Sequence, residues 1–381
     1  MRRRTIHPLA MLALLALPAL PACGGDGDAE AKGGRRAEAG DTGKAGSLKG
    51  APNAPPIAPA DTATRRVRDA LARHDSAAAD SIAKADSVAE ASGQPVRFRA
   101  GEDPRFARQS GWPVNYPKPL PGSLLPEKRI VCYYGNPNSE RMGALGEFPR
   151  DEMLRRLRAE VDRWNQADPQ HPVVPCLHMV TVVAQGDPGP SGHYRAQMRD
   201  TQVDSIYQMA RSINGIFIID VQVGTDDIRN IMPRFENFLK RPDVHFAVDP
   251  EFYMRGGVQP GRRIGTMHAA DINYVTEQLA RIVRENRLPP KVLVIHRFTR
   301  NMVTGTEDVI LRPEVQIVMD MDGWGAPWLK RDSYRDYVVR YPVQFTGFKL
   351  FYHNDTKKGD PLMTPADLLK LEPKPLYIQY Q

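Results

Sequence analysis

Two carboxylates in the run Asp249-Pro250-Glu251 are the residues of this 381-residue chain best placed to do chemistry. They lie at the end of the predicted strand 244–249, where alternation along a strand would point both side chains the same way, one pleat apart. Close like charges raise one pKa and leave a protonated acid beside an ionised partner. Glycoside cleavage needs such a pair, because one carboxyl protonates the leaving oxygen while another carboxylate supports the cation-like transition state or activates water.

A second pair of carboxylates, Asp320 and Asp322, ends another apolar run. We predict Glu251 as the acid, Asp249 as the group that tunes its pKa, and Asp320 or Asp322 as the second carboxylate. Aromatic side chains suited to stacking on sugar rings occupy predicted loop edges near these acids: Tyr134, Tyr253, Trp324 and Trp328.

The elements that must position these residues are eight short apolar strands separated by helical patterns. The predicted strands are 129–134, 172–180, 215–223, 244–249, 291–296, 315–320, 347–352 and 375–380. The predicted helices are 150–167, 199–213, 226–240, 268–287, 326–340 and 364–371. Strands that alternate with helices form parallel sheets through right-handed crossovers. Eight such units over about 250 residues predict a single (β/α)8 TIM-type barrel, here spanning residues 112–381.

Strand alternation also predicts which side chains face the barrel interior. With Phe217, Phe246, Leu293, Ile317 and Phe348 facing the helices, several strands place a polar side chain inward near the C-terminal end, where barrel active sites lie. These residues and the loop aromatics form the predicted substrate-binding set: Tyr134, Asn136, His178, Asp220, Gln222, Tyr253, His296, Trp324, Trp328, His353 and Asp355. The alternative is an internal polar network whose members satisfy one another.

Asp249 and Glu251 resemble the end of the strand-four motif of chitinase-type barrel glycosidases, in which the final Glu is the acid. Met319-Asp320-Met321-Asp322 resembles the Met-x-Tyr-Asp of the same group on strand six. The resemblance implies a glycoside hydrolase acting on a polysaccharide. His245 and Ala247 stand where that group has further aspartates, so a substrate-assisted mechanism is not implied.

Two other classes of function remain open. His178, His296, His353, Asp220, Asp249 and Asp320 could converge as they do in barrel metallohydrolases, but no His-x-His follows the first strand. We therefore expect no cofactor and assign no metal ligands. A non-catalytic glycan-binding or structural protein built on a barrel is the second alternative.

The first hundred residues predict export. A basic start, an apolar run from Leu9 to Leu20 and the ending Leu-Pro-Ala-Cys resemble a bacterial lipoprotein signal over residues 1–22, with Cys23 as the lipidated residue. Acylation would anchor the protein to a membrane of the cell envelope. Residues 23–60 are rich in Gly, Ala and Pro and predict a disordered tether, and residues 61–92 an Ala-rich stalk helix. The whole arrangement resembles bacterial lipoproteins that carry a glycoside-hydrolase-like barrel.

Charge and cysteine content limit the partners. The formal net charge is +7, and the basic residues are interspersed with nearly as many carboxylates and form no long basic run. We therefore expect no nucleic-acid partner. We also expect a monomer. Cys132 and Cys176 could pair in an exported protein. Because side-by-side positions on adjacent strands rarely suit disulfide geometry, two buried thiols are expected.

Overall fold

The structure, a computed structural model, describes residues 98–381. The predicted signal peptide 1–22, Cys23, the tether 23–60 and the helix 61–92 lie outside the described residues, and those predictions stay untested.

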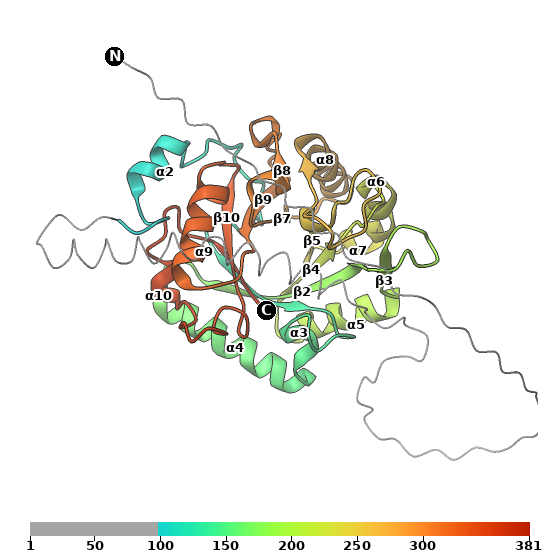
Figure 1. Cartoon of the computed structure of the whole chain (residues 1–381), viewed down its shortest axis with the longest axis horizontal. Coiled ribbons are helices and arrows are strands. Elements are labelled where there is room, and N and C mark those ends of the chain that lie inside the picture. Colours follow the sequence, from blue (N-terminus) through green and yellow to red (C-terminus); the bar gives the residue numbers. More distant parts are fainter. Residues whose placement is uncertain (1–97) are drawn as a thin grey trace, which may run out of the picture. The chain divides into compact units, whose positions relative to one another are not determined.

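Eight parallel strands form a closed barrel (Figure 1). They are β1 (Arg129–Gly135), β2 (Val173–Ala184), β4 (Ile216–Val221), β5 (Val244–Val248), β7 (Lys291–Arg297), β9 (Val315–Met321), β10 (Phe345–Leu350) and β11 (Tyr377–Tyr380). The order is β1-β11-β10-β9-β7-β5-β4-β2, and the pairing of β1 with β2 closes the ring. The predicted (β/α)8 barrel is therefore confirmed, with each predicted strand within a few residues of its place. Three short strands lie outside the ring: β3 (Arg195–Gln197), β6 (Met267–His268) and β8 (Val303–Thr304).

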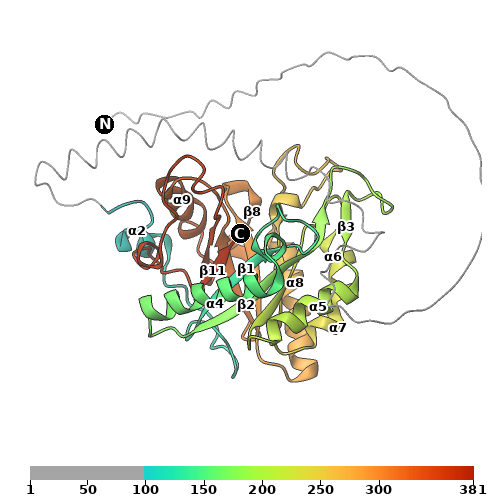
Figure 2. The ribbon, with the colours of Figure 1, turned by 90° about the horizontal axis from the view of Figure 1, so that it is seen from below.

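Helices surround the strands, and Figure 2 shows α4 along the outside of the barrel beside β1 and β2. The α-helices are α2 (Pro104–Ser110), α3 (Ala144–Glu147), α4 (Arg150–Ala167), α5 (Asp200–Arg211), α6 (Ile228–Ile231), α7 (Glu236–Leu239), α8 (Ala269–Asn286), α9 (Pro327–Ser333) and α10 (Pro365–Leu368). Four 3₁₀ segments join them: η1 (Met232–Phe235), η2 (Pro250–Phe252), η3 (Arg300–Met302) and η4 (Thr306–Asp308). No helix within residues 98–381 has the length and apolar character needed to cross a membrane.

Two predicted helices differ from the observed ones. The helix predicted over 226–240 is divided into α6, η1 and α7, because Pro233 has no N–H to continue the ladder of hydrogen bonds. The helix predicted over 326–340 begins as α9 and continues as the π-helical segment η5 (Tyr334–Val339).

The barrel separates two hydrophobic cores, and their membership confirms the predicted alternation. Phe217, Phe246, Leu293, Ile317 and Phe348 belong to the core between strands and helices. The inner core contains the alternate residues, which are apolar in the lower half of the barrel: Ile130, Cys132, Cys176, Ile216, Ile218, Ala247, Val292, Val294, Val318, Phe345 and Tyr377.

The segment before β1 packs against the inner core. Leu125 is fully buried in it, and its backbone N–H donates to Oε1 of Gln316 at 3.1 Å. Gln316, an inward residue of β9, also accepts from the N–H of Leu124 at 2.9 Å. The floor of the barrel is thus filled mainly with apolar side chains, and its Gln316 is hydrogen-bonded to the backbone of the segment before β1. The charged groups lie at the opposite, carboxyl end of the strands.

Cys132 and Cys176 form a disulfide, so the prediction of two buried thiols is wrong. The two residues are directly opposite each other in the β1–β2 register, with Cα atoms 4.2 Å apart. Both belong to the inner core, so their side chains leave the strands on the same side and meet inside the barrel.

Candidate active site

A buried layer of charged side chains lies at the carboxyl ends of the barrel strands. We call it the polar layer, and its members are His178, Asp220, His296, Asp320, Asp322 and Lys349. Each is at most 1% exposed. Asp220, His296, Asp320 and Lys349 are each the last residue but one of their strand. The same strand alternation that fills the floor with apolar groups therefore brings these side chains together above it.

At one end of the layer, two histidines converge on one carboxylate. Nε2 of His178 lies 3.2 Å from Oδ2 of Asp220, and Nε2 of His296 lies 3.3 Å from the same oxygen. A shift of register between Val180 and Val182 marks a bulge in β2 beside Asp220. There the hydroxyl of Thr181 donates to the backbone carbonyl of Asp220 at 2.8 Å, which fixes this strand end.

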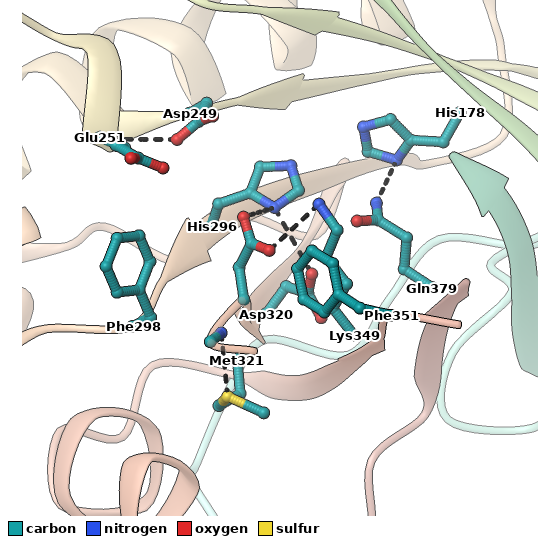
Figure 3. Close-up of polar contacts among 12 residues, drawn as sticks. His178, Asp249, Glu251, His296, Phe298, Asp320, Met321, Lys349, Phe351 and Gln379 are labelled. Atoms are coloured by element: carbon teal, nitrogen blue, oxygen red, sulfur yellow. Dashed lines mark hydrogen bonds and ion pairs between the residues drawn. The ribbon is translucent and has the colours of Figure 1, made fainter. Parts of the chain in front are cut away.

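The second nitrogen of His296 faces two further carboxylates. Its Nδ1 lies 3.3 Å from Oδ2 of Asp322 and 3.5 Å from Oδ2 of Asp320. Nζ of Lys349 lies 3.0 Å from the other oxygen of Asp322 and 3.6 Å from the centre of the Tyr134 ring. His296 thus bridges Asp220 on one side and Asp320 and Asp322 on the other. Figure 3 shows Asp320 and Lys349 beside the His296 ring.

The second nitrogen of His178 is held by the last strand. Its Nδ1 lies 2.7 Å from the hydroxyl of Tyr377 and 3.1 Å from Nε2 of Gln379. Gln379 also donates to the Tyr377 hydroxyl at 2.8 Å. The ring of His178 is therefore fixed in orientation, with Nε2 turned toward Asp220.

Burial and charge move the pKa values of the layer in different directions. Burial lowers the pKa of His178 to about 4, although Asp220 opposes the shift. Burial also disfavours the charged form of His296, but the carboxylates of Asp220, Asp320 and Asp322 raise its pKa well above the ordinary value. Burial alone would raise the pKa of Asp220, yet the charge of His296 holds it below its usual range. Burial raises the pKa of Asp320, and His296 opposes it only in part.

Asp249 and Glu251 lie beside the layer, but not as two inward residues of one strand. β5 ends at Val248, and η2 follows with Asp249 as its N-cap. Oδ1 of Asp249 accepts from the backbone N–H of Glu251 at 3.0 Å, and Oδ2 accepts from Nε2 of Gln222 at 3.2 Å. The prediction that both carboxylates point the same way, one pleat apart, is wrong because the proline begins a turn.

Figure 3 shows Glu251 and Phe298 on one side of the His296 ring and His178 on the other. Glu251 is 3% exposed and Asp249 is 3% exposed. The four predicted catalytic carboxylates thus come to the same end of the barrel, where the pair that follows β5 and the pair at the end of β9 are separated by β7 in the strand order.

Several predicted substrate-binding residues support the backbone. Gln222 accepts from the N–H of Ala184 at 3.0 Å while it donates to Asp249. Asn136 is fully buried and donates to the carbonyl of Val180 at 2.7 Å. Tyr253 belongs to the core outside the barrel and lies under the guanidinium of Arg255.

The prediction that His353 and Asp355 extend the inward face of the seventh barrel strand is wrong, because β10 ends at Leu350. His353 is exposed and pairs with Glu147 at 2.8 Å. Asp355 is buried, and its Oδ2 lies 2.9 Å from Nζ of Lys330. Trp324 is buried in the β9–α9 loop, and Trp328 is half-buried on α9.

Three residues that form or contact the polar layer were not assigned a role from the sequence: Lys349, Tyr377 and Gln379. Lys349 could have been assigned to the site from the sequence, because strand alternation makes it an inward lysine at a strand end. Tyr377 and Gln379 alternate on β11 but act through His178, a partner 199 and 201 residues away along the chain. Their role depends on closure of the barrel.

The strand pairing and the strand-end site define this chain as a (β/α)8 barrel protein. In comparisons with solved structures it is similar to the cellulase Cel5C_n, with 12% sequence identity and a TM-score of 0.37, over 70% of this chain and 76% of that one. It is also similar to the Bacillus subtilis mannanase BCman, with 12% identity and a TM-score of 0.33, over 67% of this chain and 80% of that one. No protein-family model and no curated protein sequence matches the chain.

Proposed function

We propose that this protein is an exported, membrane-anchored glycoside hydrolase that acts on a polysaccharide through carboxylates at the carboxyl ends of the barrel strands. Glu251 is the proposed acid, Asp320 or Asp322 the second carboxylate, and Asp249 the group that positions Glu251. The observation that carries the proposal is the gathering of these buried acids, from the segment after β5 and the end of β9, at the end of the barrel opposite its apolar floor.

The contacts of each carboxylate support this division of roles. One oxygen of Asp249 accepts a hydrogen bond from the backbone N–H of Glu251 and the other accepts from Gln222, which suits a positioning residue. Asp320 and Asp322 lie at 3.5 and 3.3 Å from a buried histidine, and Asp322 also pairs with Lys349. An ionised carboxylate at this position can stabilise positive charge that develops on a sugar ring.

The Cys132–Cys176 disulfide supports the exported location. Disulfides persist in oxidising compartments and are rare in the cytosol, where thiols are kept reduced. Together with the signal-like residues 1–22 and Cys23, it supports a lipoprotein of the cell envelope, anchored by acyl chains on Cys23.

A second candidate function is a non-catalytic envelope protein that binds glycans or has a structural role. The complete burial of His178, Asp220, His296 and Asp320 favours it, because buried charges that neutralise one another also form stable internal networks.

Reducing-sugar release from a panel of bacterial and plant polysaccharides separates the two functions. The purified full chain is compared with Glu251→Gln and Asp320→Asn, since loss of a general acid lowers the rate by roughly 10²- to 10⁴-fold. Glu285→Gln is the matched control, because Glu285 is 54% exposed at the end of α8 and pairs only with Arg281 in the described part of the chain.

Release by the wild type and by Glu285→Gln, but not by Glu251→Gln, would establish the glycosidase and its substrate class. A folded wild type that releases no sugar from any polysaccharide, and whose far-UV circular dichroism is normal, would instead support the non-catalytic candidate.

A further inference from the structure

We infer that His178, Asp220 and His296 form a binding site for a divalent transition-metal ion of the zinc class. The inference goes beyond the proposed glycosidase and departs from the expectation, drawn from the sequence, of no metal ligands. It rests on the arrangement of three side chains from β2, β4 and β7 and of the groups behind them.

The first observation is the spacing of the donor atoms. The three donor atoms lie within 4.8 Å of one another. Nε2 of His178 and Nε2 of His296 are 3.2 and 3.3 Å from Oδ2 of Asp220. Ligands about 2.0–2.1 Å from a tetrahedral zinc ion are separated by roughly 3.3 Å, so these two separations match the edges of a zinc tetrahedron.

The second observation is that the short distances are not hydrogen bonds. Neither Nε2 atom and neither oxygen of Asp220 has a hydrogen-bond partner among the described residues, although all three side chains are fully buried. Buried polar atoms in native proteins are almost always satisfied, and an ion is one of the few explanations for a group that is not.

The third observation is the support behind each histidine. In protein metal sites the imidazole nitrogen that does not bind the metal faces a carboxylate, carbonyl or similar group, which fixes the ring. Nδ1 of His296 faces Asp322 and Asp320, and Nδ1 of His178 faces the Tyr377 hydroxyl. Both rings thus present Nε2 to the same carboxylate, with the Nδ1 of His178 hydrogen-bonded to Tyr377 and the Nδ1 of His296 directed at two carboxylates.

The fourth observation is charge. Asp220, Asp320 and Asp322 supply three carboxylates to this network, while Lys349 supplies one ammonium group. An imidazole that binds a metal through Nε2 is neutral, so with both imidazoles bound a divalent ion would balance the remaining negative charge. Two imidazoles and one carboxylate are a donor set that zinc accepts in catalytic sites, where the ion lowers the pKa of a bound water.

The test is metal binding by the purified full chain after dialysis against a chelator. We expect isothermal titration with Zn²⁺ to give one site per chain, with a rise in melting temperature. His178→Gln, Asp220→Asn and His296→Gln should each weaken binding by more than about 100-fold, and Tyr377→Phe, which removes only outer support, by roughly 10- to 100-fold. His353→Gln is the matched control and should bind as the wild type does, because His353 is exposed and paired with Glu147.

The metal site can also be tested on the wild type alone, so that the result does not depend on whether the variants fold. X-ray absorption of the zinc-loaded chain should show two imidazole ligands, and Co²⁺ in place of Zn²⁺ should give the visible absorption of a four-coordinate ion. Absence of stoichiometric binding of both ions, a first shell without imidazole, or unchanged binding in all three ligand variants would each overturn the site. None of these readouts depends on sugar release, so failure of the glycosidase and failure of the metal site are distinguishable.

Discussion

Lys349 and Asp322 form an ion pair inside the barrel, with Nζ 3.0 Å from Oδ1 and both side chains only 2% exposed. Lys349 comes from β10, and Asp322 directly follows the neighbouring strand β9. The pair links the end of β9 to β10 within the polar layer. It also places the Lys349 ammonium group over the ring of Tyr134. Removal of Lys349 takes from the buried Asp322 carboxylate its only lysine partner in the described part of the chain, although His296 stays 3.3 Å from the other oxygen.

We therefore expect Lys349→Met to lower the free energy of unfolding by about 3–5 kcal/mol, which is the usual cost of removing one partner of a buried ion pair. Urea unfolding measures this loss. The double variant Lys349→Met/Asp322→Leu should recover part of it, because the carboxylate that lost its ammonium partner is also gone. Lys358→Met, at an exposed lysine, should stay within about 0.5 kcal/mol of the wild type. Equal losses in the single and double variants would contradict the ion-pair explanation.

The Cys132–Cys176 disulfide predicts a second stability effect. It closes a loop of 44 residues, for which loop-closure entropy gives about 4 kcal/mol. We expect the Cys132→Ala/Cys176→Ala variant to lose about this much stability in urea, and added reductant to have no further effect on it. A wild type whose stability is unchanged by reductant under unfolding conditions would argue against the bond.

Lys291 gives the stability a defined pH dependence. Its ammonium group is buried at the start of β7, which lowers its pKa to about 7, and it donates to the carbonyl of Val244 at 2.9 Å. Between about pH 7 and its ordinary pKa of 10.5 the unfolded chain therefore binds a proton that the folded chain releases. The Lys291 contribution makes the free energy of unfolding rise with pH across this window, by up to about 1.4 kcal/mol per pH unit.

Urea titrations at pH values from 7 to 10 check this dependence. Lys291→Met should lack the rise, whereas Lys118→Met, at an exposed lysine, should keep it. His245 faces Lys291, and burial lowers its pKa well below the ordinary value, so it stays neutral across the window and adds no slope. Parallel curves for the wild type and Lys291→Met would exclude Lys291 as the cause.

Asp355 predicts a local effect on the loop that carries Trp324. Its two oxygens accept from the N–H groups of Gly325 and Phe351, each at 2.9 Å, and it also pairs with Lys330. Hydrogen bonds to a charged group contribute about 1.5–3 kcal/mol each. We expect Asp355→Ala to raise hydrogen exchange at these two amides at least roughly tenfold. An increase spread evenly over the whole barrel would indicate a global rather than a local effect.

Much of the fold could be predicted from the sequence because its signals are local. The apolar runs and their alternation predict the eight barrel strands, and the inward parity of Asp220, His296 and Asp320 follows from the same period. At Pro250, however, strand alternation no longer predicts the direction of the side chains. Strand alternation predicts that Asp249 and Glu251 point the same way, but Pro250 begins η2 and turns Glu251 out of the strand pattern.

Long-range partners could not be predicted in the same way. The disulfide depends on the β1–β2 register, which places Cys132 opposite Cys176, and no local pattern specifies that register. Asp355 was expected to face the interior, yet the chain leaves β10 at Leu350 and the side chain pairs with Lys330 of the preceding helix.

The sequence by itself determined the class of the fold and the end of the barrel where charged groups gather, because strand periodicity and the direction of parallel strands depend only on residue order. Only the tertiary structure decided which groups meet. His178, Asp220 and His296 come from three different strands, and their common centre exists because the barrel closes and its stagger sets three inward residues at one height.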